Sequence, residues 1–555
     1  QWKCDDLFLS RKCLPFERNP LVSDLVGSKT STTNQAKYLA SVVEREKTEA
    51  AIPYWTIIKQ IQETGEIYCA INSKLTKSSI QKYNDQLDSW EKGKGYGITV
   101  KEDVAYIDSY EESTLFILKK LLEMSHIPNK GQKEFNERYL RQSEIVFSDL
   151  KKEAALKYAF VNSRLLLIYG AAGTGKTTLI NMISTMMAGR RKLFLTKTHT
   201  ALQNLQRRIE NPGADASFVS IDSFTKRVNL PDYDIIFVDE CSTIDNRTMS
   251  LLLGKINRDV LLVMSGDIYQ IESIDFGNWF FYAKDIIKTK GASVELGHTW
   301  RTDKEELKSL WTAVRERSSI ITEKLSMDGP FSENLGENIF HLDDDEVVLC
   351  LNYDGKFGLN NINQYFQNAN TNSKAFYWEE WTYKIGDKII FTNTKRSVLL
   401  YNNLKGTITN ISYGEKKIVF EIEIKTFYTE SQCETELFKY LRTTENGTVI
   451  EIEIISWDDE LTEEKKIMTV IPFQLAYAIS IHKAQGLEYK SVKIVIPSNN
   501  AEKITHSIFY TAITRAKEKL KIFWSAETMK SIIESFTSND IEQVTLPIIK
   551  KNLQQ

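Results

Sequence analysis

The segment 170–177, GAAGTGKT, has the residue types and spacing of a loop that holds phosphate groups. It follows an apolar run and precedes a helical stretch, a context that argues against a chance glycine-rich turn. Glycines let backbone N–H groups curl around phosphate oxygens, and the start of the helix adds a favourable dipole. We expect Lys176 to reach the β- and γ-phosphates of a nucleotide and Thr177 to ligate Mg²⁺. The predicted nucleotide-binding residues of this segment are Gly170, Gly173, Thr174, Gly175, Lys176, Thr177 and Thr178.

Two acidic residues, Asp239 and Glu240, directly follow the apolar run 234–238. A carboxylate at the end of a strand can hold the Mg²⁺ shell, and a second carboxylate beside it can polarise the attacking water. We therefore predict Asp239 as a metal ligand together with Thr177, and Glu240 as the general base. A solvated strand end is the alternative, but the phosphate loop upstream favours the catalytic interpretation.

Alternating strands and helices must position these residues. Buried parallel strands are indicated by the apolar runs 165–169, 192–196, 234–238, 260–264, 347–351, 492–496 and 520–524. Helical stretches separate these runs, which is the pattern of doubly wound α/β domains. Short strands bounded by Gly, Asn and Lys are predicted at 387–392, 406–411, 417–424 and 448–455. They interrupt the second α/β region and predict a small inserted β domain.

Four later motifs follow in order: 266–270 (GDIYQ), 300–302 (WRT), 480–488 (SIHKAQGLE) and 510–517 (YTAITRAK). In order and spacing the sequence resembles the superfamily 1 helicases, with these segments as motifs III, IV, V and VI. Motifs V and VI are most similar to the RecD-like branch, and the resemblance covers about residues 146–525. It implies an ATP-hydrolysing DNA helicase or translocase with ATP and Mg²⁺ as cofactors, moving 5′-to-3′ on single-stranded DNA.

The resemblance implies further catalytic residues. Gln270 is placed where a neutral amide senses the γ-phosphate and its water. Arg301 and Arg515, both predicted in the second α/β domain, are expected to act as arginine fingers, because a guanidinium is planar, always charged and bidentate. Gly486 in motif V is expected to contact the nucleotide. A surface salt bridge is the alternative role for each arginine.

One departure from the family concerns the base of the nucleotide. Members usually carry a Gln before the phosphate loop that reads adenine, whereas the corresponding stretch 149–154, DLKKEA, has Lys there. Gln142 is nearby but lies too early in the chain. Use of nucleoside triphosphates other than ATP therefore stays open.

The predicted fold class is α/β, with two RecA-like P-loop domains, an inserted small SH3-like β-barrel and a mainly helical N-terminal region. In the N-terminal part, Ile80, Tyr83, Leu87 and Trp90 recur at helical spacing, and 111–124 is a second helix. The predicted domains are 1–145 (accessory region of unknown role), 146–299 (RecA-like 1A), 300–383 with 471–530 (RecA-like 2A), 384–470 (SH3-like 2B) and 531–555 (C-terminal tail).

Residues that contact the nucleic-acid track are predicted in both α/β domains. The segment 196–205 resembles motif Ia, where hydroxyls, His and helix N-terminal N–H groups contact the phosphodiester backbone. The predicted contacts are Thr198, His199, Thr200, Asn204, His482 and Lys483. Helix capping is the alternative for Thr198 and Thr200, and a core position is the alternative for His482.

The aromatic side chains of Phe224, Trp279, Tyr353 and Phe391 suit either base stacking or, more commonly, core packing. A polar run at 352–355, followed by Asn361 and Asn363, suggests a strand-facing loop.

The bulk composition leaves several partners open. The net charge of −3 gives no global basic signal, but a motor can bind a strand in a local groove. No apolar run could span a bilayer, and the scattered cysteines suggest a reducing cytoplasm; Cys4 and Cys13 are weak metal candidates. The first residue is Gln1, which leaves room for upstream sequence.

Single-stranded DNA ranks above RNA as the track. The alternatives are an RNA helicase and a nucleic-acid-sensing ATPase that gates a partner, such as a nuclease, through residues 1–145. A role in DNA repair or antiviral defence is a guess from the resemblance.

Overall fold

The computed structural model describes residues 50–554 apart from short gaps. The gaps are 74, 144–148, 229–230, 258, 272–275, 342–344, 354, 372, 380, 393–395, 398, 402, 435, 458–461, 499–503 and 538–543. The described chain forms two compact units: the first contains 50–318, 505–511 and 532–554, and the second contains 319–504 and 512–531. Cys4 and Cys13 lie outside the described residues.

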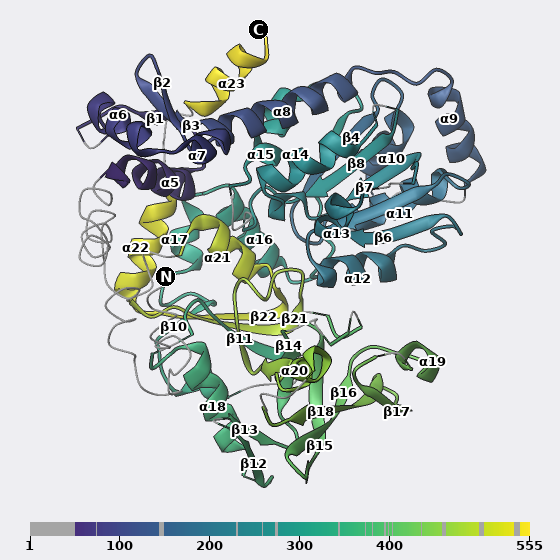
Figure 1. Ribbon diagram of the computed structural model, residues 1–555, viewed down its shortest axis with the longest axis vertical. Coiled ribbons are helices and arrows are strands. Elements are labelled where there is room, and N and C mark those ends of the chain that lie inside the picture. The colour runs from purple at the N-terminus through teal and green to yellow at the C-terminus, as the bar shows by residue number, and fades with distance from the viewer. Residues whose placement is uncertain are drawn as a thin grey trace. The chain divides into compact units, whose positions relative to one another are not determined.

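A six-stranded sheet forms the centre of the first unit (Figure 1). Its strands are β4 (Leu165–Gly170), β5 (Lys192–Thr196), β6 (Ala216–Ser220), β7 (Ile235–Val238), β8 (Leu261–Gly266) and β9 (Ser293–Leu296). The order is β6-β5-β7-β8-β4-β9, and every neighbouring pair runs parallel. The four predicted strands of this domain are confirmed, and all four are buried along their length, as expected for a sheet covered on both faces.

Helices cover both faces of this sheet. They are α10 (Leu150–Tyr158), α11 (Lys176–Met186), α12 (His199–Arg208), α13 (Ile221–Lys226), η1 (Cys241–Thr243), α14 (Asn246–Lys255), α15 (Trp279–Ile286) and α16 (Glu305–Arg315). Alternate residues of β4 enter different cores: Leu165 and Leu167 pack with α14 and α15, whereas Leu166 and Ile168 pack with α10 and α11. This two-sided burial explains why the strand reads as a continuous apolar run.

The predicted domain boundary at residue 300 is wrong, because residues 300–318 belong to the first unit. The buried face of α16 carries Leu307, Leu310 and Val314. Its last residue, Arg315, pairs with Glu295 on the edge strand β9 at 2.6 Å. Helix α16 therefore completes the domain of the phosphate loop instead of opening the next one.

The described part of the N-terminal region is a mixed lobe within the first unit. Its helices are α5 (Ile52–Thr64), α6 (Lys77–Gln86), α7 (Ser89–Gly93), α8 (Asp108–Ser125) and α9 (Gln132–Gln142). An unpredicted antiparallel sheet, β1 (Cys69–Ala70), β2 (Ile98–Lys101) and β3 (Val104–Ile107), has the order β1-β3-β2. The predicted helix at 79–90 breaks after Gln86, because Asp88 and Glu91 form a capping box that starts α7. Trp90 is consequently 63% exposed.

The C-terminal segment is not a tail. It forms α22 (Ala526–Thr537) and α23 (Thr545–Leu553), and Figure 1 shows α23 beside α8. The Thr545 hydroxyl accepts the backbone N–H of Ile67 at 3.0 Å, and the Thr545 N–H donates to Glu66 at 2.6 Å. Ile549 is fully buried in the core that α8, α14 and α15 share. Residues 545–553 are therefore an integral element of the first unit.

The second unit is built on a five-stranded parallel sheet. Its strands are β10 (Ser332–Glu333), β11 (Glu346–Cys350), β20 (Ala478–Ser480), β21 (Tyr489–Val495) and β22 (Ala516–Phe523), in the order β10-β22-β21-β11-β20. The helical elements of this unit include α17 (Ile320–Lys324), η2 (Glu337–Phe340) and α18 (Leu359–Ala369). Most of α21 (His506–Ile513) belongs to the first unit. The second predicted α/β sheet is thereby confirmed.

An antiparallel β insert interrupts the second unit. Its strands are β14 (Lys388–Phe391), β15 (Lys405–Gly414), β16 (Lys417–Ile424), β17 (Lys439–Thr443), β18 (Thr448–Ile455) and β19 (Phe473–Leu475), with α19 (Glu430–Cys433) and α20 (Glu463–Met468). The strand order is β17-β18-β16-β15-β14-β19. A hairpin of β12 (Ala375–Trp378) and β13 (Trp381–Lys384) packs on the same core through Phe376, Trp378 and Tyr383. The insert thus begins near 375 and not at 384, and its likeness to an SH3 domain stays a prediction.

No helix in the described part of the chain is both long and apolar enough to cross a membrane.

Candidate functional site

The phosphate loop joins β4 to α11 at the carboxyl edge of the first sheet. Gly173 and Gly175 have φ angles of 77° and 85°, a region that residues with a Cβ rarely enter. The Lys176 ammonium donates to the carbonyl oxygens of Gly170 at 2.9 Å and Ala171 at 3.0 Å. The loop lysine therefore lies over the backbone that its own glycines curve, where phosphate oxygens would bind.

Three carboxylates follow β7 and β8 at the same edge. Asp239 is buried, and its Oδ1 accepts hydrogen bonds from the Ser265 hydroxyl and from the Glu240 N–H. Glu240 has a left-handed φ of 56°, which stores strain where the strand ends. Burial lowers the pKa of Lys176, while the charges of Asp267, Asp239 and Glu240 raise it. The three acids are therefore close enough to Lys176 to act on its charge.

Asp267 is a site residue that the sequence did not single out. It is buried, and its Oδ2 accepts the side-chain N–H of Gln270 at 3.0 Å, while its Oδ1 accepts the Tyr269 N–H at 3.2 Å. The predicted γ-phosphate sensor is thus anchored by the acid three residues earlier. The sequence did carry a signal for this residue, because Asp267 directly follows the buried strand β8 just as Asp239 follows β7.

The segment 299–301 lies against the phosphate loop. The Trp300 N–H donates to the Gly173 carbonyl at 2.7 Å, and the Thr299 hydroxyl donates to the Ala172 carbonyl at 2.9 Å. A Cβ on Gly173 would collide with the Cβ of Arg301, and the charge of Arg301 lowers the pKa of Lys176. Arg301 therefore acts from the same unit as the loop, and its predicted position in the second α/β domain is wrong.

Thr177 and Asp239 form the donor set predicted for Mg²⁺. A hydroxyl and a carboxylate suit Mg²⁺, which keeps several of its waters and needs few protein ligands. The bonds from Ser265 and Glu240 to one oxygen of Asp239 hold that carboxylate in place. Among the described residues, no three or more His, Cys, Asp or Glu side chains gather into a metal-binding group. The hydroxyl of Thr177 and the carboxylate of Asp239 therefore fit a Mg²⁺ that is bound mainly by a nucleotide and by water.

Arg515 and Gly486 belong to the second unit. Arg515 is 2% exposed, and its guanidinium donates to the Leu487 carbonyl and to the Thr514 hydroxyl, both at 3.2 Å. Gly486 has a φ of 77°, which favours glycine at that turn. The cluster around Lys176 within the first unit thus includes Gln270 and Arg301 but neither of these two residues.

The predicted motif Ia contacts lie at the start of α12, after β5. The Thr198 hydroxyl accepts the Ala201 N–H at 3.2 Å, so the capping alternative describes this side chain. His199 is exposed and Asn204 is half-buried. The side chain of Thr200 lies outside the described residues. His199 is therefore accessible for a contact with a bound strand.

In the second unit, motif V follows β20. His482 is exposed, so its alternative as a core histidine is wrong. The Lys483 ammonium donates to the Gln474 side-chain oxygen at 2.8 Å and lies 6.0 Å from the centre of the Tyr353 ring. Tyr353 is 44% exposed. Beside His482, a cation can contact a backbone phosphate and an exposed aromatic ring can stack on a base.

The other aromatic side chains considered for stacking are core residues: Phe224, Trp279 and Phe391 are each at most 2% exposed. Asn363 also has a structural role, because its amide donates to the Ala478 carbonyl at 2.9 Å and accepts the Ala478 N–H at 2.8 Å. Asp354 lies outside the described residues. Tyr353 and Asn361 therefore keep accessible side chains among the described residues of the proposed strand-facing loop.

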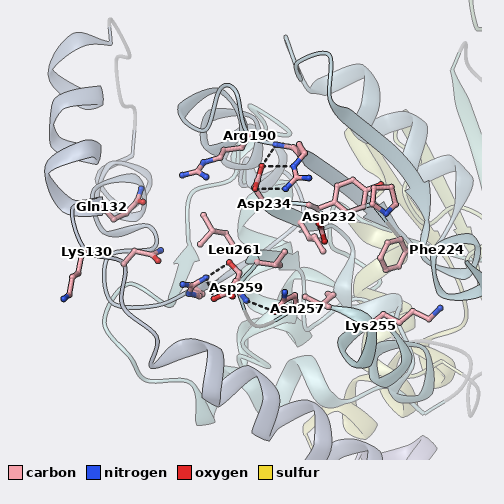
Figure 2. A pocket seen from close by; sticks show the side chains of 18 residues that line it. Lys130, Gln132, Arg190, Phe224, Asp232, Asp234, Lys255, Asn257, Asp259 and Leu261 are labelled. Atoms are coloured by element: carbon pink, nitrogen blue, oxygen red, sulfur yellow. Dashed lines mark hydrogen bonds and ion pairs between the residues drawn. The ribbon is translucent and has the colours of Figure 1, made fainter. Parts of the chain in front are cut away.

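Figure 2 shows a pocket of about 660 Å³ on the first unit. Among its lining residues, Arg164, Arg191 and Asp234 directly precede β4, β5 and β7, so the pocket lies at the amino edge of the sheet. Its charges are paired: Arg191 with Asp234 at 3.4 Å, and Arg164 with Asp259 at 3.1 Å. Ligands of open α/β sheets bind at the carboxyl ends of the strands, so this pocket is separate from the nucleotide loop.

Two protein families match parts of the chain: the AAA domain at residues 150–329 and the UvrD-like helicase C-terminal domain at 475–522. An uncharacterised protein of Methanocaldococcus jannaschii is 24% identical over 80% of this chain, which spans 44% of that protein. The RecBCD enzyme subunit RecD of Buchnera aphidicola (subspecies Schizaphis graminum) is 22% identical over 75% of this chain and 80% of the relative. The crystal structure of Bacteroides Pif1 bound to ssDNA is 14% identical, with a TM-score of 0.43, over 69% of this chain and 94% of that chain.

Proposed function

The chain belongs to the superfamily 1 helicases, in the RecD-like branch of ATP-hydrolysing DNA helicases, and we propose that it couples nucleotide hydrolysis to 5′-to-3′ movement along single-stranded DNA. The observation that carries this proposal is the cluster around the loop lysine. Asp239, Glu240, Asp267 and Arg301 all act on the charge of Lys176. Such a set of acids, an arginine and a phosphate loop has the parts that phosphoryl transfer needs.

Each residue of the cluster has a proposed task. Lys176 and the loop N–H groups hold the β- and γ-phosphates, and Glu240 accepts a proton from the attacking water. Gln270, held by Asp267, orients that water, and Arg301 neutralises charge that develops on the γ-phosphoryl oxygens. Mg²⁺, when bound with the nucleotide at Thr177 and Asp239, supplies further charge neutralisation. Arg515 and Gly486 are proposed to make hydrolysis depend on the second unit.

The proposed track is single-stranded DNA. The exposed side chains of His199, His482 and Tyr353 and the ammonium of Lys483 follow strands of the two parallel sheets. Phosphate contacts carry no sequence information, which suits a motor that steps along any sequence. A role in DNA repair or antiviral defence remains a proposal from the resemblance alone.

A second candidate is a nucleic-acid-sensing ATPase that gates a protein partner. The observation that favours it is the exposure of large apolar side chains on the N-terminal lobe: Trp55 is 47% exposed, Trp90 63% and Phe116 44%. A contiguous exposed apolar patch is a mark of a protein-binding surface.

Steady-state nucleotide hydrolysis separates these candidates. The rates of the wild-type protein are compared without nucleic acid and with single-stranded DNA, duplex DNA or single-stranded RNA. Strong stimulation by single-stranded DNA alone supports the motor, and strand displacement from substrates with one 5′ or one 3′ tail then reports the direction of movement. Stimulation by none of them contradicts the motor and favours the gated ATPase.

The variant Lys176→Ala is the control for contaminating hydrolysis. Losing the ammonium that holds the β- and γ-phosphates is expected to lower the hydrolysis rate at least about 100-fold. An unchanged rate in this variant would overturn the assignment of the nucleotide site.

A further inference from the structure

Lys152 on α10 places a cation beside the phosphate loop. Its side chain is 5% exposed, and its ammonium is the nearest atom that a Cβ on Gly175 would meet, at 2.5 Å. The same Cβ would lie 3.6 Å from the Thr178 hydroxyl. The Lys152 ammonium therefore lies near Gly175, at one end of the loop. The Lys176 ammonium is held near Gly170, at the other end.

Among the described residues, none accepts a hydrogen bond from the Lys152 ammonium, and no described carboxylate forms an ion pair with it. Burial lowers the pKa of Lys152, and the charge of Asp149, at the start of the same helix, only partly offsets this effect. An ammonium that makes no bond to a described protein acceptor can donate to a ligand bound at the adjacent phosphate loop.

The indole ring of Trp300 borders this ammonium. Trp300 is tied to the loop through the Gly173 carbonyl, is 51% exposed, and has its ring centre 5.9 Å from the Lys152 ammonium. His298 lies edge-on against the ring, with 4.3 Å between ring centroids. A half-exposed aromatic face next to a hydrogen-bond donor suits a heteroaromatic base, whose face stacks and whose edge accepts.

We propose that Trp300 stacks on the base of the bound nucleotide and that Lys152 donates to an acceptor on its edge, so that the site prefers purines with a keto oxygen at position 6. A lysine has three donors and no acceptor. Guanine presents two acceptors on the relevant edge, N7 and O6, whereas adenine presents N7 and an N6 amino group that is itself a donor. GTP and ITP are therefore better substrates than ATP. This inference rests on the proposed function, since it concerns the base of the nucleotide held by the same loop.

The test measures hydrolysis of ATP, GTP and ITP, with binding of ADP, GDP and IDP by calorimetry as a readout independent of nucleic acid. In the wild type, kcat/KM for GTP and ITP is expected to exceed that for ATP by about tenfold, the worth of one hydrogen bond to a charged donor. ITP carries O6 but lacks the 2-amino group of guanine, so equal preference for ITP and GTP assigns the effect to O6.

Three variants make the test specific. Lys152→Gln, whose amide can accept from N6, is expected to shift the preference about tenfold towards adenine nucleotides, and Lys152→Met to remove the preference. Lys151→Gln is the matched control, because Lys151 is the neighbouring lysine on α10 and is exposed. It is expected to keep the wild-type ratio.

Two results contradict the inference and leave the proposed function intact. One is equal use of ATP, GTP and ITP by the wild type. The other is an equal loss for all three in Lys152→Gln, which makes Lys152 a phosphate contact. Absence of binding and hydrolysis with every nucleotide in the wild type instead contradicts the proposed function itself.

Discussion

At the residue scale, the carboxylate of Asp267 has two roles. One oxygen accepts the Gln270 side chain at 3.0 Å and the other accepts the Tyr269 N–H at 3.2 Å, while its charge is the largest one that raises the pKa of Lys176. It therefore fixes the orientation of a neutral amide and tunes a cation in one place. Neutralising it is expected to disturb both functions without removing a direct phosphate contact.

The variant Asp267→Asn should accordingly lower kcat for nucleotide hydrolysis by about 100-fold, the size typical for one misplaced polar group in a transition state. KM should change much less, because Lys176 and the loop N–H groups remain. Steady-state kinetics with saturating single-stranded DNA measures both constants. Asp259→Asn, at the far edge of the same sheet, is the control and should keep the wild-type kcat. A large rise in KM with kcat unchanged would contradict this assignment.

Site residues were predictable where the signal is local in sequence. The loop 170–177 and the pair Asp239 and Glu240 stand on recognisable strand ends, and the structure brings them together. The position of Arg301 was not predictable, because its contact with Gly173 joins residues more than a hundred positions apart. The sequence shows a lysine where the family has its adenine-reading Gln and places Trp300 in motif IV. That Lys152 and Trp300 meet at the loop was not predictable, because it depends on how α10 and the segment after β9 pack there.

At the element scale, a lysine joins the β insert to the sheet of the second unit. The Lys405 ammonium on β15 lies 3.6 Å from the centre of the Tyr489 ring on β21. Burial lowers the pKa of Lys405 from its ordinary 10.5 to about 8, with Asp345 opposing and nearby lysines adding to the shift. The contact with the ring offsets part of the cost of burying the charge.

Stability should therefore depend on pH through Lys405. Between pH 8 and 10.5 the unfolded chain binds a proton at this side chain that the folded chain has lost, so the free energy of unfolding rises with pH across this window. Lys405→Met should stabilise the protein at pH 7 and remove this part of the rise. Chemical unfolding at several pH values measures it, with Lys439→Met, an exposed lysine of β17, as the control. Parallel pH profiles for wild type and Lys405→Met would contradict the role.

Helix α23 contributes to the first unit through one apolar side chain. Ile549→Ala should lower the free energy of unfolding by about 2–4 kcal/mol, since it removes a fully buried side chain from a packed core. Lys550→Ala, at the next and exposed position, should change it by less than about 0.5 kcal/mol. Denaturant unfolding followed by tryptophan fluorescence compares the two. If Ile549→Ala unfolds like the wild type, α23 does not belong to that core in solution.

Strands and helices, like the site residues, were predictable where the signal is local in sequence. The central strands β4, β5, β7 and β8 were predicted because burial on both faces makes them continuous apolar runs. The edge strands β6 and β9 were missed because they are only partly buried and lack such runs. The C-terminal helix was predicted as a tail because its partners, Glu66 and Ile67, lie at the other end of the chain.

At the scale of the whole molecule, the proposed function requires an acidic protein to bind a polyanion. The net charge is −3, so under the proposed function attraction to DNA comes from local cations, for which we propose Lys483, and not from the overall field. Few phosphates are then neutralised, and the affinity for single-stranded DNA should depend only moderately on salt.

Lys483→Ala should weaken binding of every single-stranded sequence to a similar extent. It should also make the slope of log affinity against log salt concentration less steep by about 0.7, the contribution of one phosphate on a single strand. Fluorescence anisotropy with labelled oligonucleotides at several salt concentrations measures the slope. Lys490→Ala, an exposed lysine at the start of β21, is the control and should leave it unchanged. An unaltered slope in Lys483→Ala would remove this residue from the DNA contacts.

The position of α23 also has a consequence for biosynthesis. The lobe and sheet of the first unit emerge from the ribosome first, but the buried place of Ile549 stays empty until residues 545–553 have been made. Residues 319–504 are synthesised in between, and at about 5–20 residues per second this interval lasts on the order of ten seconds or more. For that time the nascent first unit exposes an apolar surface beside α8, where chaperones or an early binding partner have access.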